Sequence, residues 1–116
     1  VVALEIREDN LSSPEVKALI AEHINGMRKS TPSGHVHALE VEKLQLPTIT
    51  FWSAWIDGEL CGCGALKELD AVTGEVKSMR TRTEFLRRGV GQALLDEIVH
   101  TARSRGYSRL LLETGT

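Results

Sequence analysis

The sequence predicts an α+β fold of the three-layer α/β type, in which a mixed sheet carries helices on both faces. Three observations predict it. Apolar residues recur with period 2 early in the chain, tight-turn signals join the middle strands into an antiparallel meander, and the last third reads strand, helix, strand. That last spacing makes its two strands parallel, with a right-handed connection. The 116 residues suffice for one domain, residues 1–116.

A strand and two helices are expected before the meander. In VALEIRE, Val2, Leu4 and Ile6 alternate with other residues, as in a half-buried strand. Ser12 or Ser13 can cap a helix with Pro14 in its first turn. The apolar residues that follow recur at helical spacing: Val16, Leu19, Ile20, Ile24 and Met27. TPSG then interrupts the chain, and HVHALEVEKLQ predicts a second short helix that ends at Pro47.

Three strands are expected in the middle of the chain. TITFWSAWI is rich in β-branched and aromatic residues, and the pair Asp57-Gly58 after it is a strong tight-turn signal. ELCGCGALKEL returns as the second strand, DAVTG turns again, and EVKSMRT is the third. Cys61 and Cys63 are two residues apart on the second strand, so we expect both thiols on one face, as small buried core residues in a reducing compartment.

From Val90 onward the apolar period changes from that of a strand to that of a helix. The stripe is formed by Val90, Leu94, Ile98 and Ala102. Gly106 fits just past the helix end, at the position that favours glycine. YSRLLLE follows as a short apolar strand, expected to lie parallel to EVKSMRT.

The stretch FLRRGVGQALL, residues 85–95, places two arginines and two glycines where this helix begins. A glycine within a helix costs about 1 kcal/mol relative to alanine, so bare backbone is expected to serve a purpose. Backbone N–H groups at a helix start can converge on an anion, and glycine permits close approach. The stretch favours phosphate or pyrophosphate binding, and a merely tight loop entry is the alternative. No P-loop is present, and a dinucleotide fingerprint fails because position 94 is Leu94.

Charge and composition narrow the class of protein further. The net charge is −2, yet residues 71–116 hold 8 Lys+Arg against 5 Asp+Glu, a surplus that suits an anionic ligand. No run approaches the ~18 apolar residues of a membrane span, and the acidic start does not read as a signal peptide. A cytoplasmic, bacterial-type setting is expected. No metal site is expected, because the paired C-x-x-C motifs of ribbon-type sites do not occur.

The segment from GEVKSMRT to RLLLETG resembles the acetyl-coenzyme A-binding core of the GNAT N-acetyltransferase superfamily. It is similar in particular to small bacterial members of the YsnE type, which share FWSAW, CGALKELD and KSMRT in this order. The likeness runs from about Ser33 to the C-terminus. It implies the GNAT-like mixed sheet and transfer of an acetyl group from acetyl-CoA to a primary amine. The chain stops at LETGT, so the C-terminal helix and strands of the family are expected to be missing from it.

The resemblance also implies the residues that contact acetyl-CoA. The family pattern Q/R-x-x-G-x-G/A falls on residues 86–91, with Leu86 in place of the polar first residue, so one polar contact is expected to be lost. Backbone amides would hold the pyrophosphate, and the preceding strand would pair with the pantetheine arm. The amide set is Arg87, Arg88, Gly89, Val90, Gly91 and Gln92, and the strand set is Met79, Arg80 and Thr81.

Acceptor and catalytic residues follow less directly. Glu75 matches a position where some relatives carry a catalytic glutamate, and its alternative is an exposed strand-end carboxylate. His37, with His35, is expected in a loop near the acceptor site, and solvent-facing loop histidines are the alternative. His23 and His100 are expected to be structural. Trp52 and Trp55 lie on opposite faces of one strand; one of them is expected to fill the core and the other, taken as Trp52, to border the acceptor pocket.

Two other functions stay open on the sequence alone. The first is a catalytically silent module that binds acyl-CoA as a sensor. The second is a nucleic-acid binder that uses the arginines around Arg80 to Arg88, which the net charge of −2 and only five aromatic residues disfavour. The expected partner is a small-molecule or peptide amine, with neither nucleic acid nor a membrane. An incomplete sheet edge is compatible with a homodimer.

Overall fold

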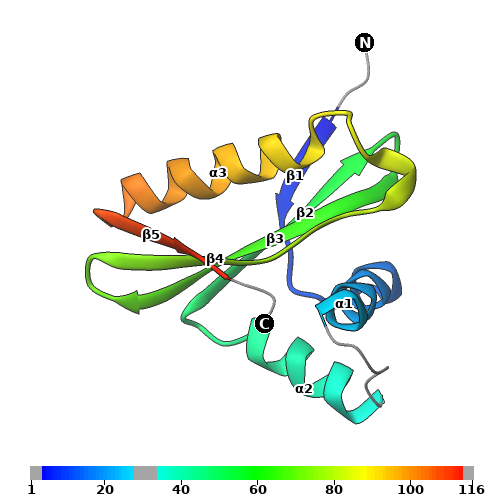
Figure 1. The fold of residues 1–116 in the computed structure, drawn as a ribbon, viewed down its shortest axis with the longest axis horizontal. Helices are drawn as coiled ribbons and strands as arrows, with labels where there is room; N and C mark the ends of the chain where they lie inside the picture. Colours follow the sequence, from blue (N-terminus) through cyan, green and yellow to red (C-terminus); the bar gives the residue numbers. More distant parts are fainter. Residues whose placement is uncertain (1–3, 28–33, 114–116) are drawn as a thin grey trace.

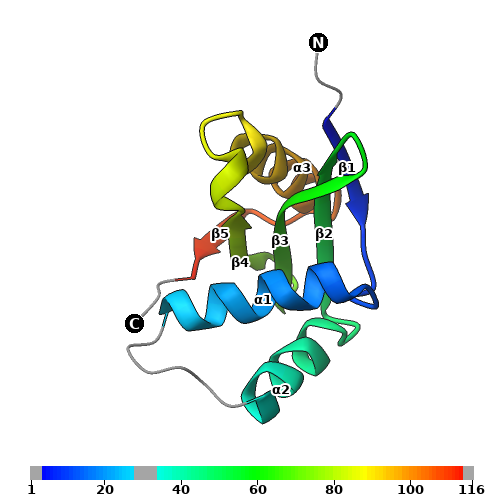
Figure 2. The ribbon, with the colours of Figure 1, turned by 90° about the vertical axis from the view of Figure 1, so that its right-hand side faces the viewer.

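One five-stranded sheet lies between two helix layers in the computed structural model, which describes residues 4–27 and 34–113 (Figure 1). The elements are β1 (Leu4–Glu8), α1 (Pro14–Met27), α2 (Gly34–Leu44), β2 (Ile49–Ile56), β3 (Glu59–Asp70), β4 (Thr73–Thr81), the 3-10 turn η1 (Thr83–Phe85), α3 (Val90–Ser104) and β5 (Arg109–Leu112). The sheet order is β1-β2-β3-β4-β5. The first three pairings are antiparallel and the last is parallel. Figure 2 shows α3 on one face and α1 with α2 on the other, which confirms the predicted fold class.

The central hairpin forms where the sequence predicts it. Asp57 and Gly58 both have positive φ, 50° and 80°, as a tight hairpin turn requires. Trp52 and Trp55 point to opposite faces, as expected: Trp52 packs in the core beneath α3, and Trp55 packs in the core beneath α1. The sheet thus divides two separate apolar cores.

The prediction for the two cysteines is wrong in its geometry. Both thiols are buried and free, but Cys63 belongs to the core on the α1 side and Cys61 to the core on the α3 side. The cause is a bulge: Trp55 pairs with Leu60 and Ala54 with Gly62, which leaves Cys61 as the extra residue. A bulge of this kind reverses the alternation of side chains.

The helix α1 begins as predicted. The Ser13 hydroxyl oxygen accepts a hydrogen bond from the backbone N–H of Val16 at 3.2 Å, which satisfies one free donor of the first turn. The predicted apolar stripe is buried against the sheet at Val16, Leu19, Ile20 and Ile24. Val2, and the side chain of Met27, lie outside the described residues.

The βαβ unit is also confirmed. The predicted stripe of α3 is buried at Val90, Leu94, Ile98 and Ala102. Gly106 has φ 82°, and its N–H and that of Tyr107 donate to the carbonyls of Arg103 and Ala102, both at 3.0 Å. These two bonds form a Schellman motif, which ends the helix and turns the chain back into β5.

One irregularity of β4 was not predicted. Ala65 pairs with Lys77 and Cys63 with Arg80, so Ser78 and Met79 together face Gly64, and Ser78 has φ 57°. Strand β5 pairs with β4 only as far as Val76, apart from a hydrogen bond from the Glu113 N–H to the Val76 carbonyl. The two parallel strands therefore separate at the bulge. Within residues 4–27 and 34–113, no helix is both long and apolar enough to cross a membrane.

Candidate functional site

The helix α3 begins with a group of free backbone donors. Gly89 is its N-cap, with φ 81°, and Arg87 before it has φ 65°. No side chain caps the helix, and the first hydrogen bond back to the cap runs from the N–H of Ala93 to Gly89. Among the hydrogen bonds between described residues, none uses the amide of any residue from 87 to 92 as donor. The first turn of a helix leaves such donors unsatisfied, and its dipole favours an anion there.

Gly89 and Gly91 differ in why a glycine fits their positions in this turn. Gly89 has a positive φ, which is costly for other residues, so its backbone conformation alone explains the glycine. Gly91 has an ordinary φ, and a Cβ added there would meet only the Thr81 hydroxyl oxygen, at 3.7 Å. Packing within the described residues therefore does not require a glycine at 91. The open space beside Gly91 leaves the backbone of this turn accessible to a ligand.

The charges around this turn are positive. The first turn of α3 has no acidic residue. Arg87 and Arg88 are exposed, and the Arg88 guanidinium lies 5.5 Å from the centre of the Phe85 ring. Leu86 is 53% exposed, so it presents an apolar surface where the family pattern has a polar residue. The free amides and the two arginines together make this turn a candidate anion site.

A free edge of β4 leads from this anion site to the bulge. No strand among the described residues pairs with β4 after Val76 on the side of β5. The side chains along this edge are engaged elsewhere: the Met79 sulfur packs over Gly64, and the Arg80 guanidinium lies 3.4 Å from the Glu22 carboxylate of α1. At this edge, an extended ligand can therefore hydrogen-bond to the backbone N–H and C=O groups of residues 79–81. From Thr81 back to Ser78 the edge spans roughly 10 Å at the usual rise of a strand.

A cavity of about 220 Å³ opens where β4 and β5 separate, on the side of α1. It is lined by His23, Val76, Lys77, Ser78, Met79, Leu112 and Glu113. The Glu113 carboxylate accepts a hydrogen bond from the Ser78 N–H at 3.2 Å. Its second oxygen lies 3.6 Å from the Lys77 ammonium, and its first lies 3.7 Å from His23 Nε2. The cavity thus joins an apolar wall to a small group of ionisable side chains.

His23 is an unusual member of this group. Its Nε2 atom is buried and has no hydrogen-bond partner among the described residues. Burial lowers the pKa of the His23 imidazole, the Glu113 carboxylate opposes that effect, and Arg80 adds to it. We expected His23 to be structural, whereas its side chain lines the cavity at the end of the free edge, beside Glu113.

The predicted catalytic residue Glu75 lies outside this cavity. It is half-buried in the part of β4 that is paired on both sides, opposite Lys67 of β3 and Leu111 of β5. Four residues separate it from Met79, roughly 13 Å along the strand. Its role stays a prediction.

The two predicted acceptor-site residues are placed differently from what the sequence indicated. Trp52 is only 1% exposed and packs among the core residues beneath α3, so an acceptor arriving from solvent cannot contact it. His37 lies on α2 rather than in a loop, and its Nε2 is 3.2 Å from the side-chain oxygen of Asn25 on α1. The side chain of His35 lies outside the described residues. Trp52 is therefore removed from the candidate site, and His37 stays a prediction.

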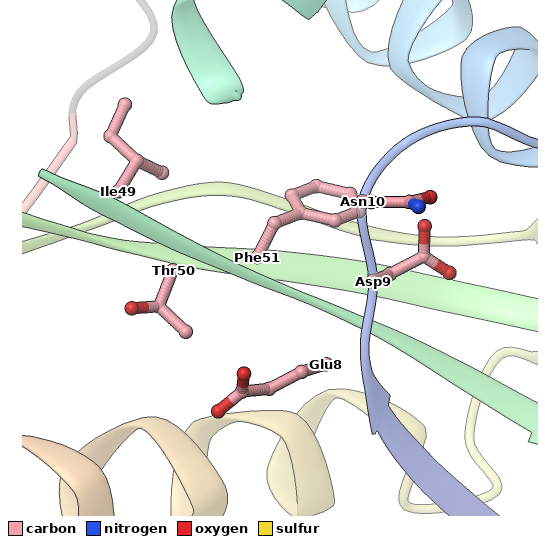
Figure 3. Close-up of a pocket in the computed structure, with 6 residues that line it drawn as sticks. All are labelled: Glu8, Asp9, Asn10, Ile49, Thr50 and Phe51. Atoms are coloured by element: carbon pink, nitrogen blue, oxygen red, sulfur yellow. The ribbon is translucent and has the colours of Figure 1, made fainter. Parts of the chain in front are cut away.

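A larger cavity lies elsewhere. It has a volume of about 500 Å³, lies where β1 ends, and is lined by Glu8, Asp9, Asn10, Ile49, Thr50 and Phe51 (Figure 3). Asp9 already accepts hydrogen bonds from the Leu11 N–H and the Ser53 hydroxyl, at 2.8 and 2.7 Å. The Glu8 carboxylate points away from Asp9 in Figure 3. The side-chain oxygens of Asp9 and Asn10 accept hydrogen bonds at the turn into α1, and the Thr50 hydroxyl accepts one from Arg105, so these polar groups do not converge on a shared ligand. Among the described residues no three His, Cys, Asp or Glu side chains are grouped as a metal site requires.

Comparison with known proteins gives consistent matches. The model of the acetyltransferase (GNAT) family matches residues 18–116. The chain is 50% identical to the uncharacterized N-acetyltransferase YsnE of Bacillus subtilis, over 97% of this chain and 75% of that protein. It is 51% identical to the uncharacterized N-acetyltransferase YedL of Escherichia coli, over 96% of this chain and 70% of that protein. A GNAT acetyltransferase structure from Elizabethkingia anophelis, with acetyl-CoA bound, shares the fold with a TM-score of 0.71 at 21% identity, covering 96% of this chain and 65% of that one.

Proposed function

The chain belongs to the acetyltransferase (GNAT) family, and from that premise we propose that it transfers an acetyl group from acetyl-CoA to a primary amine. The observation that carries the proposal is the set of free amides at the start of α3. Backbone N–H groups that donate to no described residue, beside two exposed arginines and an unhindered glycine, are suited to bind a pyrophosphate. The amides of residues 87–92 would hold it.

The free edge of β4 accounts for the rest of the donor substrate. With its pyrophosphate at α3, the pantetheine arm would run along residues 79–81 and hydrogen-bond their main chain, as an added strand does. The thioester would then reach the cavity at the bulge. Leu86 would give no polar contact to the pyrophosphate.

The proposed reaction is direct attack of the amine on the thioester carbonyl within a ternary complex. When the cavity holds the amine next to the thioester, no covalent enzyme intermediate is needed, because positioning of the two reactants supplies much of the rate acceleration. A backbone N–H at Met79 or Arg80 would stabilise the oxyanion that forms on the carbonyl oxygen.

Titration calorimetry with acetyl-CoA tests the donor site. We expect the wild-type chain to bind and Gly91→Asp to abolish binding, because a carboxylate would then stand where the pyrophosphate lies. Gly91→Ala is the matched control: its Cβ meets only the Thr81 hydroxyl at an ordinary contact distance, so binding should persist. Equal binding by Gly91→Asp and wild type would contradict the proposed site.

Release of free coenzyme A thiol tests the reaction itself. The wild-type chain is incubated with acetyl-CoA and a panel of primary amines, among them n-butylamine, and thiol is measured over time. Amine-dependent thiol release supports the acetyltransferase. Binding of acetyl-CoA without thiol release across the panel would instead support a silent acyl-CoA sensor.

A further inference from the structure

We propose that His23 accepts a proton from the ammonium form of the acceptor amine while Glu113 binds that ammonium beside it. This inference rests on the proposed function and assigns two residues of the same site. Most primary amines are protonated near pH 7, and an ammonium cannot attack a carbonyl carbon. A transferase for amines therefore needs a base within hydrogen-bond reach of the acceptor nitrogen.

The geometry places a base and an anion side by side at the end of the β4 edge. His23 Nε2 and Glu113 Oε1 are 3.7 Å apart, too far for a hydrogen bond between them. One ammonium nitrogen can lie within hydrogen-bond distance of both atoms. Both residues line the cavity, together with Ser78 and Met79, where the free edge delivers the thioester.

His23 Nε2 has no hydrogen-bond partner among the described residues, which indicates that another group occupies this position in the working protein. A buried polar atom without a hydrogen bond typically costs about 1–3 kcal/mol. A bound amine or water between His23 Nε2 and Glu113 would remove that cost. Glu113 is itself held in place, because the Ser78 N–H and the Lys77 ammonium both approach its carboxylate.

The charges around the ring keep it able to accept a proton. Burial lowers the pKa of the His23 imidazole, so the ring is neutral near pH 7. The facing charged groups come from three directions: Glu113 after β5 and Glu40 of α2 raise the pKa, and Arg80 of β4 lowers it. The Lys77 ammonium of β4 lies beside Glu113 Oε2, the carboxylate oxygen farther from His23. The Glu22 carboxylate of α1 is paired with Arg80.

The proton steps balance as follows. The ammonium gives one proton to the neutral His23 ring and becomes an amine, while the imidazolium is stabilised by the Glu113 carboxylate. The amine lone pair forms the C–N bond, and the C–S bond breaks with its electron pair on sulfur. His23 returns its proton to the thiolate, and the second proton of the new amide nitrogen leaves to solvent. The products are the N-acetylated amine, coenzyme A thiol and one proton.

The test compares two acceptors that differ in their need for a base. n-Butylamine is protonated at pH 7, whereas hydroxylamine is already neutral there. We expect His23→Gln to lower kcat/KM for n-butylamine roughly 100-fold or more, and to lower it far less for hydroxylamine. The acid limb set by His23 should be replaced by a rate that follows the fraction of neutral n-butylamine and therefore keeps rising with pH until the pKa of the amine is reached.

Glu113→Gln gives a second and independent readout. Removing this carboxylate takes away a charge that raises the His23 pKa. The acid limb for n-butylamine should therefore move to lower pH, while KM for n-butylamine rises. A merely structural role of Glu113 would not move the limb in that direction.

His100→Gln is the matched control, because His100 is an exposed histidine of α3 on the other side of the sheet. It should keep the wild-type rate and pH profile. If His23→Gln keeps the n-butylamine rate and the acid limb, the inference is overturned while the acetyltransferase stands. Failure of the wild-type chain to bind acetyl-CoA would remove the proposed function and this inference with it.

Discussion

Arg80 of β4 and Gly62 of β3 lie so close together that a Cβ on Gly62 would be 2.8 Å from the Arg80 carbonyl oxygen. The same Cβ would be 3.0 Å from a methyl carbon of Val90, the first residue of α3. Gly62 therefore sits where the strand that carries the free edge meets the helix that carries the free amides. Because Gly62 has no side chain, β4 and the start of α3 can approach each other this closely. Gly62 thereby sets the distance between the free edge of β4 and the free amides of α3.

Gly62→Ala should destabilise the fold and weaken acetyl-CoA binding together. The new methyl group meets backbone, which cannot rotate away, and overpacking of this kind typically costs about 1–3 kcal/mol. Urea unfolding and calorimetry measure the two effects. Gly64→Ala is the matched control: its Cβ meets the mobile end of Met79 first, so it should affect stability less. Wild-type binding by Gly62→Ala would show that this packing does not shape the site.

His23 should make the protein less stable as the pH falls below the usual histidine range. Because its pKa is lowered in the fold, the unfolded chain binds more protons than the folded chain once the pH drops below about 6.5. The stabilising effect is present above that pH and is lost as the pH falls through the folded value, at up to about 1.4 kcal/mol per pH unit. Urea midpoints measured from neutral to mildly acidic pH should show this slope.

The slope should shrink in His23→Gln and persist in His100→Gln. Each variant removes one histidine, and the two histidines lie on opposite sides of the sheet. A pH slope of stability that shrinks only in His23→Gln therefore belongs to His23 and not to histidines in general. An equal slope in His23→Gln and wild type would mean that His23 is not buried in its neutral form.

Cys63 should produce the opposite dependence at alkaline pH. Burial raises the pKa of its thiol to about 12, so the folded chain keeps a proton that the unfolded chain loses above about pH 9. Stability is therefore full below that pH and decreases as the pH rises toward the folded value. The free energy of unfolding should fall less steeply in Cys63→Ala than in wild type over this range. A thiol reagent that modifies Cys63 in the native protein as fast as in urea would contradict this account.

Local patterns predicted those parts of the fold that depend on local physics. The hairpin at Asp57-Gly58 follows from the backbone conformations that a tight turn requires, and the α3 stripe follows from helical spacing. The free amides at Gly89 follow from helix geometry, since every helix start has unsatisfied donors. The loop could therefore be identified from the sequence, and the structure adds that no described side chain caps it.

The parts that sequence analysis missed depend on irregular or distant pairings. The bulge at Ser78 separates β4 from β5, yet Ser78 is neither glycine nor proline and gives no local signal. The bulge at Cys61 reversed the side-chain alternation on which the cysteine prediction relied. The approach of His23 to Glu113 brings α1 next to the residue that follows β5, so only the assembled sheet places these two side chains together. Trp52 was misassigned because alternation places Trp52 and Trp55 on opposite faces without revealing that helices cover both faces and bury both side chains.

Leu86→Arg should strengthen acetyl-CoA binding. Leu86 is 53% exposed just before the anion site, at the position where the family pattern has Gln or Arg. An arginine there would add a mobile donor for the pyrophosphate, and a charge-assisted hydrogen bond is worth about 1.5–3 kcal/mol when well formed. We expect a several-fold to tenfold tighter Kd by calorimetry, with a gain that declines at high salt because exposed charges are screened. Leu46→Arg is the matched control, since Leu46 is 51% exposed and lies before β2, away from the free amides. An equal gain in both variants would mean that net charge alone, rather than a contact at the start of α3, attracts the nucleotide.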